Sequence, residues 1–425
     1  MNVIARALGL RVPYAWVVVA AVFFAMVASA GVRSMPGVLL VPLETDLGWD
    51  RSVISFAAAV GIALYGLMGP FAASIMLRFG IRLTVLTALA LLCLSVAATT
   101  LVDKPWQMVV VWGVLTGLGS GTIASVLGAT IVGRWFRQRR GLAMGLLTAS
   151  TVIGQLVFLP VVAALIDRLG WRHAMLAGAV APALAFPVIW LLLPESPASI
   201  GLRPYGASGQ EDEPPVQGNP LANAFRVLGQ GVRVPAFWLL FGSFFICGFS
   251  TTGLVGTHMI AFCVDHGLPE MQAAGLVATM GVLNLLGTTA SGWMSDRYDN
   301  RMLLAWYYGL RGLSLLYLSL SDFDLLQLSV FGIFYGLDWI ATVPPTVRLI
   351  AQSCGESNAA ILYGWIAVGH QVGAGIAAYG AAWSRDATGS YFQAFVIAGV
   401  ACLAVASAFV WTLVTGGLQL RRETS

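Results

Sequence analysis

Long apolar stretches separated by short polar segments constrain this chain more than any other feature. Most of about twelve such stretches reach the ~20 residues that a helix needs to cross ~30 Å of hydrocarbon. In a chain with 58% hydrophobic and 10% charged residues, this pattern predicts an all-α polytopic membrane protein and excludes a soluble domain large enough to act alone. The stretches cover roughly 14–36, 52–76, 83–101, 107–133, 141–165, 173–193, 235–262, 271–294, 302–320, 325–347, 358–384 and 391–415.

The basic residues predict the orientation of these spans. Lys104 is the only lysine, and the rest are arginines. If the N-terminus is cytoplasmic, most of them fall on the inner side, including Arg78, Arg82 and the cluster at 134–140, as the positive-inside rule requires. Both termini are then expected in the cytoplasm. The net charge of +4 follows from this topology and does not indicate nucleic-acid binding.

Neither a cofactor nor a reaction is indicated. The five cysteines are odd in number, widely spaced and mostly within apolar stretches, so ordinary packing explains them and no metal or disulfide framework is expected. No nucleophile and base, metal-ligand cluster or phosphate-binding motif occurs with a known spacing. The chain is therefore not expected to be an enzyme.

A polar segment at 194–234 divides the chain. Its prolines, its glycines and the acidic run Glu211–Asp212–Glu213 cannot cross a membrane, so we expect a cytoplasmic linker between a bundle at 1–193 and a bundle at 235–425. Asn219 followed by Pro220 can cap and start a short helix. That helix is expected at the membrane surface.

The two sides of the linker repeat each other at an offset of 219 residues, as from Gly145 to Gly364. Each half has an even number of spans and inserts the same way up, which predicts two parallel-repeat six-helix bundles that rock about a central site. The matched residues are Arg78, Arg82, Gly145, Gly154, Asp167 and Gly170 with Arg297, Arg301, Gly364, Gly373, Asp386 and Gly389.

The loop at 292–301, Gly-Trp-Met-Ser-Asp-Arg-Tyr-Asp-Asn-Arg, resembles the signature between the second and third helices of each half in the major facilitator superfamily. The segment at 73–82 is a degenerate version of the same signature, with Leu77 where the family has aspartate. The resemblance implies the twelve-helix major facilitator fold and a cytoplasmic gate held by ion pairs and helix-end contacts. A stop-transfer charge cluster is the alternative reading. The implied gate residues are Arg78, Arg82, Asp296, Arg297 and Arg301.

Two further motifs narrow the resemblance to the bacterial monocarboxylate-porter branch. They are Gly-Trp-Asp-Arg-Ser at 48–52 and Gly-Leu-Arg-Pro-Tyr-Gly at 201–206. The branch implies transport of a small organic anion with a proton across the bacterial inner membrane. Drug/proton antiport is disfavoured, because Gly113 stands where those antiporters have arginine.

Candidate substrate residues follow from the need for a cation to meet an anion. Arg33, near the outer end of the first span, lies close to where the family places a receiving basic residue, although it equally fits an arginine that snorkels to water. His370 lies near the midplane of the eleventh span and can titrate near neutral pH, or be a neutral packing residue. The uncharged candidates are Tyr65, Gln155, Asn284 and Thr288, the last two standing where many relatives have Asp and Arg.

Arg311 and Asp338 are charges isolated in the middle of apolar stretches. A charged side chain inside a membrane is usually paired with an opposite charge or needed for function. Both residues lie at similar depth on consecutive spans, so they can meet. The pair is either a structural clasp or a proton-coupling site, in which Asp338 takes the proton and Arg311 is released. Pro344 and Pro345 predict a kink just after Asp338.

These residues favour a secondary active transporter, proton-coupled symport of a small monocarboxylate by alternating access. Two alternatives stay open. One is an exporter or exchanger of larger amphipathic compounds, and the other is a membrane sensor that binds solute without moving it. The sequence does not choose the substrate, the stoichiometry or the oligomeric state.

Overall fold

The computed structural model describes residues 13–49, 51–207 and 219–415, and within them the regular elements are helices, with one isolated parallel bridge between Phe136 and Tyr205. Eleven of the described helices are long and apolar enough to cross a membrane. The remaining predicted span is α15 (Asn300–Ser319), whose arginines and tyrosines lower its apolar character. The predicted multi-pass, twelve-helix architecture is confirmed. Asp50 and the acidic run at 211–213 lie outside the described residues.

The chain divides into two compact units. Unit 1 comprises Met1–Gln138 and Ser150–Arg226, and unit 2 comprises Arg139–Ala149 and Val227–Ser425. The start of α9 therefore clusters with the later half of the chain. The expected boundaries of the linker at 194–234 stay a prediction.

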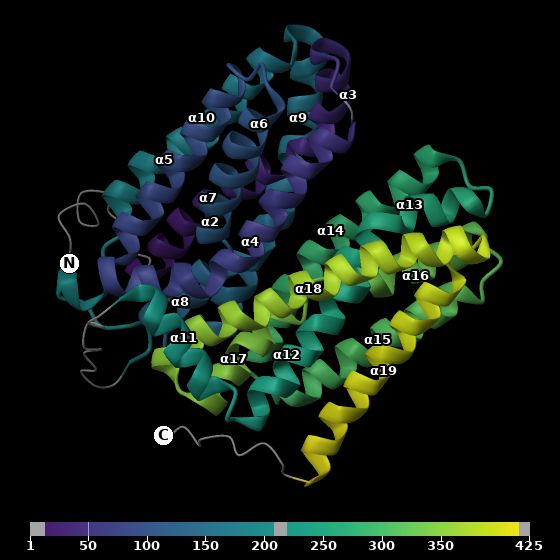
Figure 1. The fold of residues 1–425 in the computed structure, drawn as a ribbon. Coiled ribbons are helices and arrows are strands. Elements are labelled where there is room, and N and C mark those ends of the chain that lie inside the picture. The colour runs from purple at the N-terminus through teal and green to yellow at the C-terminus, as the bar shows by residue number, and fades with distance from the viewer. Residues whose placement is uncertain (1–12, 50, 208–218, 416–425) are drawn as a thin grey trace. The chain divides into compact units, whose positions relative to one another are not determined.

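Unit 1 builds its spans from one to four helical pieces each. Figure 1 shows α5 and α10 side by side, as the second half of the unit packs back on the first. The elements are α2 (Tyr14–Ser34), α3 (Pro36–Leu47), α4 (Arg51–Phe79), α5 (Ile81–Thr99), α6 (Pro105–Met108), η1 (Val109–Thr116), α7 (Gly117–Thr122), α8 (Ser125–Trp135), α9 (Arg140–Leu169), α10 (Trp171–Leu192), η2 (Ala198–Ile200) and α11 (Pro220–Gly231).

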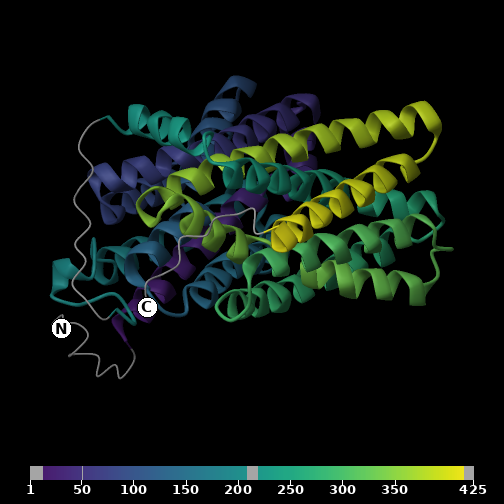
Figure 2. The ribbon, with the colours of Figure 1, turned by 90° about the horizontal axis from the view of Figure 1, so that it is seen from below.

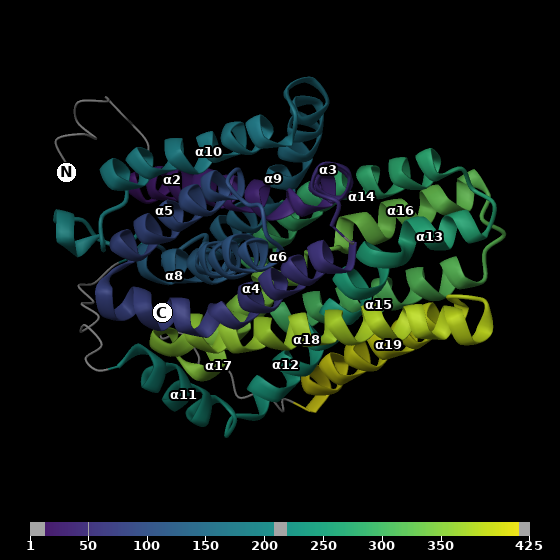
Figure 3. The same cartoon turned by 45° about the horizontal axis from the view of Figure 1, so that its top comes forward.

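Besides the start of α9 and the end of α11, unit 2 contains the helices from Pro235 onward, and the first of its spans contains a π-helical segment. Figure 3 shows α15 beside α19, and Figure 2 shows α18 turning back into α19 at the yellow end of the chain. The elements are α12 (Pro235–Gly248), η3 (Phe249–Val255), α13 (Gly256–Asp265), α14 (Glu270–Ser295), α15 (Asn300–Ser319), α16 (Leu325–Asp338), α17 (Val343–Cys354), α18 (Glu356–Thr388) and α19 (Phe392–Thr415).

The repeat read from the sequence recurs in the backbone of each unit. Gly48 and Gly267, 219 residues apart, both adopt positive φ, at 65° and 86°. Close helix packing recurs too. A Cβ on Gly117 would lie 2.8 Å from the carbonyl oxygen of Gly61, and a Cβ on the matching Gly336 would lie 2.9 Å from Cα of the matching Met280. The second and fourth spans thus approach each other in the same way in both units.

The fourth span of each unit is broken. In unit 1, α7 ends at Thr122 and the chain passes through Ala124, at φ −95° and ψ −171°, before α8. In unit 2, α16 ends at Asp338 and α17 starts at Val343 with prolines in its first turn. Proline lacks an N–H and crowds the preceding turn, so the kink predicted at Pro344 and Pro345 is confirmed.

The segment at 201–206 docks on the end of α8. Tyr205 N–H donates to Trp135 O at 2.8 Å, and Arg137 N–H donates to Tyr205 O at 2.9 Å. The Tyr205 ring lies 5.7 Å from that of Phe136 and 6.1 Å from that of Trp16. In unit 1 this motif therefore fixes the chain between α8 and α9.

Candidate functional site

A cavity in unit 1 is bounded by the end of the first span, the second span and the π-helical part of the fourth. Its volume is about 120 Å³. One arginine, hydroxyl groups, small residues and one indole line it. The lining residues are Arg33, Ser34, Ala58, Gly61, Ile62, Trp112, Thr116, Gly117 and Ser120.

Arg33 supplies the positive charge of this cavity. It stands in the last turn of α2 and is half-buried, with its guanidinium carbon 4.6 Å from the centre of the Tyr65 ring. A guanidinium over an aromatic face is held by cation–π attraction and keeps its N–H donors for other partners. Within the described part of the chain, Arg33 forms no ion pair. The structure therefore brings together two of the predicted substrate residues, Arg33 and Tyr65.

The hydroxyl protons around the cavity are already used inside the protein. Ser95 Oγ donates to Val111 O at 2.7 Å and lies 2.5 Å from Thr116 Oγ1, so the threonine must donate to the serine. Ser120 Oγ donates to Thr116 O at 2.6 Å, and Ser34 Oγ donates to Gly31 O at 2.7 Å. Arg33 is therefore the charged donor that the cavity offers, and the hydroxyls present oxygen lone pairs.

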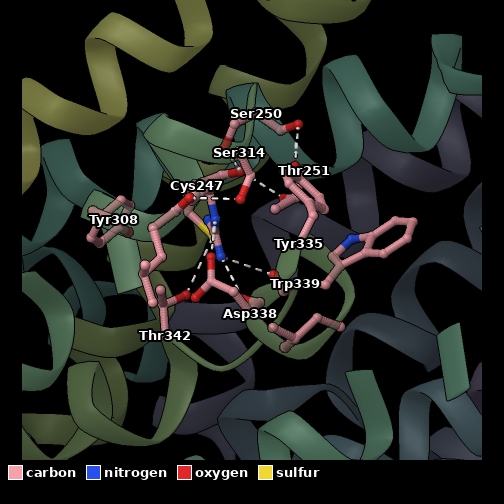
Figure 4. Close-up of polar contacts among 12 residues, drawn as sticks. Cys247, Ser250, Thr251, Tyr308, Ser314, Tyr335, Asp338, Trp339 and Thr342 are labelled. Atoms are coloured by element: carbon pink, nitrogen blue, oxygen red, sulfur yellow. Dashed lines mark hydrogen bonds and ion pairs between the residues drawn. The ribbon is translucent and has the colours of Figure 1, made fainter. Parts of the chain in front are cut away.

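Unit 2 holds a buried charge cluster, shown in Figure 4. Arg311 Nε donates to Asp338 Oδ2 at 2.6 Å, and its Nη1 donates to Cys247 Sγ at 3.1 Å. Arg311 is 0% exposed and Asp338 is 4% exposed. The sequence-predicted meeting of the two charges is thus present, and it lies on α15 and the last residue of α16.

The same guanidinium also binds the backbone where the fourth span of unit 2 breaks. Nη2 donates to Asp338 O at 2.7 Å and to Trp339 O at 3.2 Å. Both carbonyls lie at the end of α16 or just beyond it, where i+4 donors are lacking. Asp338 Oδ1 has no hydrogen-bond partner among the described residues. The cluster thus keeps one free carboxylate oxygen in the interior.

Two tyrosines enclose the cluster. The Arg311 guanidinium lies 5.4 Å from the Tyr308 ring centre, and Tyr308 OH donates to Ser243 O at 2.7 Å. Tyr335 OH donates to Ser250 O at 2.8 Å (Figure 4). Both hydroxyls donate to backbone carbonyls, so neither phenol proton is directed at Asp338.

Other candidates in unit 2 support the same break. Asn284 Oδ1 accepts from Ile340 N–H at 3.1 Å and from Thr288 Oγ1 at 2.9 Å. Ser291 Oγ donates to Ala341 O at 2.5 Å. Asn284 and Thr288 are both buried, so in this conformation they hold backbone and each other.

His370 lies on α18 beside α12. The two helices are so close that a Cβ on Gly248 would collide with His370 O. The imidazole is half-buried, with its ring centre 5.5 Å from that of Phe244. His370 therefore packs against α12, the helix that also carries Cys247. Gln155, on α9, is half-buried and belongs to unit 1.

Asp296 caps a helix, as a gate residue of the implied kind would. Its carboxylate accepts from Gly141 N–H at 2.7 Å and Leu142 N–H at 2.9 Å, at the start of α9 within unit 2. Arg348 Nη1 donates to the same carboxylate at 2.6 Å. Anions are stabilised at helix N-termini, so the arrangement binds α9 to the end of α14.

The remaining implied gate residues make local contacts. Arg301 donates to Asp299 Oδ2 at 2.6 Å, and this side-chain hydrogen bond lowers the pKa of Asp299. Arg297 lies 4.0 Å from the Trp293 ring centre. In unit 1, Arg78 is exposed, 5.9 Å from the ring centre of its neighbour Phe79. The backbone of Arg82 donates to Glu195 at 3.2 Å, and Glu195 caps α5.

Sequence reasoning missed three participants. Cys247 was expected to be ordinary packing, yet it contacts Arg311. Arg348 directly follows an apolar stretch, four residues after Pro344, and no local signal pointed from it to Asp296. Glu195 stands in the linker, and its capping of Ile81 N–H at 2.7 Å leaves no local sequence signal.

Comparisons with known proteins agree with this architecture. A family model described as the Major Facilitator Superfamily matches residues 22–378. Monocarboxylate transporter 13 of Rattus norvegicus is 26% identical over 401 residues, covering 92% of this chain and 87% of that protein. The uncharacterized MFS-type transporter YcxA of Bacillus subtilis (strain 168) is 24% identical over 394 residues, covering 88% and 90%.

Solved structures share the fold. The human organic anion transporter MFSD10 (TETRAN) superposes with a TM-score of 0.68 at 15% identity, covering 94% of this chain and 100% of that one. The proton:xylose symporter XylE superposes with a TM-score of 0.68 at 16% identity, covering 94% and 96%. The family and these relatives are transporters and not enzymes. With most of its length matched, the chain belongs to the Major Facilitator Superfamily and is a multi-pass membrane transporter.

Proposed function

We propose that this transporter carries a small organic monocarboxylate together with a proton across the bacterial inner membrane by alternating access. Two kinds of similarity support the class of substrate. Relatives named monocarboxylate transporters match 92% of the chain, and a structural neighbour is named an organic anion transporter. Both termini and the 194–234 linker lie in the cytoplasm in this proposal, in keeping with the distribution of arginines.

The observation that carries the proposal is Arg33. It faces a cavity, rests on Tyr65 and has no acidic partner within the described residues. A half-buried guanidinium without a counter-ion favours an anion, and a carboxylate fits its paired N–H donors. Tyr65 orients the guanidinium, and Gln155 of the same unit is a further polar contact for substrate.

The coupling proton is assigned to the unit 2 cluster. Asp338 has an unpartnered carboxylate oxygen, and His370 packs on Phe244 of α12, the helix that carries Cys247 of the same cluster. A proton on either group changes the charge seen by Arg311. Asp296, with Arg297, Arg301, Arg78 and Arg82, forms the proposed cytoplasmic gate, and Asn284 and Thr288 change partners when the break in the fourth span of unit 2 moves.

One alternative has a specific observation in its favour. Apart from Arg33, the cavity walls are largely Ala58, Gly61, Ile62 and Trp112, which suit an amphipathic compound exported or exchanged by the same fold. A sensor that binds without moving solute is the other. The exporter or exchanger would move amphipathic compounds in place of small carboxylates, and the sensor would bind solute without any flux.

The test uses purified protein, first for binding and then for uptake. Ligand-dependent thermal stabilisation by a panel of carboxylates is compared for wild type, Arg33→Gln and a matched Arg172→Gln, which removes an arginine of unit 1 paired with Asp46 outside the cavity. We expect stabilisation by small monocarboxylates that Arg33→Gln abolishes and Arg172→Gln leaves intact. Stabilisation and export of uncharged amphipaths would favour the first alternative, and binding without flux would favour the sensor.

A further inference from the structure

The internal repeat gives the buried charge pair a counterpart without charge. Shifted by 219 residues, Arg311 corresponds to Leu92 of α5 and Asp338 to Gly119 of α7. Those two residues also meet, because a Cβ on Gly119 would lie 3.0 Å from Leu92 Cγ. The third and fourth spans of unit 1 therefore pack at this point by apolar contact alone.

The two units differ in where the fourth span breaks. In unit 1, Gly119 O still accepts the helical i+4 bond from Ile123 N–H, at 3.3 Å, and α7 continues to Thr122. In unit 2, Asp338 O accepts only an i+3 bond from Ala341 N–H, at 3.2 Å, and α16 has already ended. The break of unit 2 thus begins three residues earlier than its counterpart, close to one turn.

Arg311 supplies what an earlier break requires. A guanidinium carries five N–H donors in a fixed plane. Here it binds the two carbonyls at the break, those of Asp338 and Trp339, while Asp338 Oδ2 and Cys247 Sγ hold its remaining sides. A leucine at this position could donate to neither carbonyl. Asp338 O would keep its bond from Ala341 N–H, but Trp339 O would lose the donor that Arg311 supplies, and a carbonyl without a donor is costly in a membrane.

We propose that Arg311 is a positioning residue, held in place by Asp338, which fixes the break of the fourth span of unit 2 at residues 339–342, and that transport depends on this clamp. The proposal rests on the proposed transport function, but the position of the break is measurable without any substrate. In unit 1 the third and fourth spans make the corresponding contact with apolar residues alone. The charge pair of unit 2 is then not needed for that helix contact. The clamp keeps residues 339–342 out of the helix, where Asn284 and Ser291 bind their backbone groups beside Asp338.

The decisive variant places the residues of unit 1 at these two positions of unit 2 and keeps Pro344 and Pro345, where unit 1 has Ser125 and Val126. In Arg311→Leu/Asp338→Gly both charges go together, so neither is left buried and alone. We expect a folded, monodisperse protein in which amide hydrogen exchange at 339–342 slows at least about tenfold as the helix extends toward Thr342. Uptake should show a maximal rate at least about tenfold lower with KM within about threefold of wild type, because Arg33 in unit 1 is untouched.

A matched control removes an exposed pair of the same unit. Asp265→Asn/Arg385→Gln deletes an ion pair of similar composition, 3.0 Å long, at the far end of the spans, and should leave exchange at 339–342 and uptake unchanged. A double variant with wild-type exchange and maximal rate overturns the clamp. A double variant that does not fold, beside a folded control, also overturns it, because the pair would then be required by the fold.

Arg311→Lys provides a second, independent test. Lysine keeps the charge and can bind Asp338, but it cannot reach all four acceptors in one plane. Because the pair with Asp338 then stays while the carbonyls at the break are held less well, the break persists with looser backbone. The clamp therefore predicts faster amide exchange at 339–342, opposite to the double variant, and a reduced maximal rate with unchanged KM. Wild-type values in both would contradict it. If the wild-type protein moves no carboxylate, the exchange measurement still decides the clamp, whereas the proposed function fails.

Discussion

At the scale of single residues, two arginines differ in how many partners they have, and the difference indicates different functions. Arg33 stacks on Tyr65 and leaves its N–H groups to the cavity. Arg311, 0% exposed, makes four contacts, with a carboxylate, a thiol and two carbonyls. The first arrangement suits a transient anion, and the second suits holding backbone.

Arg33 should set both the affinity for substrate and the kind of substrate. A charge-assisted hydrogen bond is worth about 1.5–3 kcal/mol, so Arg33→Gln should raise KM by about tenfold to a hundredfold. The cavity hydroxyls already donate elsewhere and present lone pairs, so among acids of equal length one with an added hydroxyl, which can donate to them, should be preferred to one with an added keto group, which cannot. Competition of both acids against a labelled substrate measures this, and a preference for the keto acid would contradict the described hydrogen bonding.

Arg311→Leu alone should damage the fold more than the double variant does. Removing one partner leaves Asp338 ionised or unpaired inside the protein, a loss of about 3–5 kcal/mol for a buried pair. Arg385→Gln breaks a pair whose side chains are 44% and 28% exposed, and it should cost at most about 1 kcal/mol. Melting temperatures in detergent compare the two, and equal melting temperatures would show that Asp338 tolerates isolation.

At the scale of helices, glycine allows the second and fourth spans to touch. Gly117→Ala places a Cβ 2.8 Å from Gly61 O, which is backbone and cannot turn aside. Overpacking of this kind costs about 1–3 kcal/mol. Gly242→Ala in α12 is the matched control, since a Cβ there has no neighbour within 4 Å. We expect it to be neutral or stabilising by up to about 1 kcal/mol.

The N-terminus of α15 should show a small dependence on acid. Asp299 caps the helix and its pKa is lowered below the ordinary 3.8 by the side-chain hydrogen bond from Arg301. Its stabilisation is therefore present above about pH 4 and is lost as the pH falls through the lower, folded-state pKa. Asp299→Asn keeps a capping side chain without the charge, and for this surface pair, whose Asp299 side chain is 36% exposed, the loss should be at most about 1 kcal/mol.

The measurement is thermal unfolding of wild type and Asp299→Asn from neutral pH to about pH 3. The curves should differ at neutral pH and converge in acid. A constant difference across this range would mean that the Asp299 charge contributes nothing.

At the scale of the whole molecule, the sequence predicted the repeat, the number of spans and the kink at Pro344 because each leaves a local trace: periodic apolar stretches, matched glycines and paired prolines. It also predicted that Arg311 and Asp338 meet. Other features depend on long-range contact. The break at Ala124 has no proline, and the roles of Cys247, Glu195 and Arg348 appear only when distant helices come together. The arginines and tyrosines of α15 lower its hydropathy below that of the other spans. Its buried arginine is tolerated because residues elsewhere in the chain bind it.

Proton-coupled carboxylate transport is the central claim, and gradient-driven uptake tests it most directly. The measurement is accumulation of labelled small monocarboxylates in proteoliposomes, with and without an inward proton gradient, for wild type and Arg33→Gln. The account predicts accumulation above equilibrium that needs the gradient, collapses with a protonophore and, at substrate concentrations below the wild-type KM, starts at least about tenfold more slowly in Arg33→Gln. Uptake that ignores the gradient, or the absence of any carboxylate flux in wild type, would contradict it.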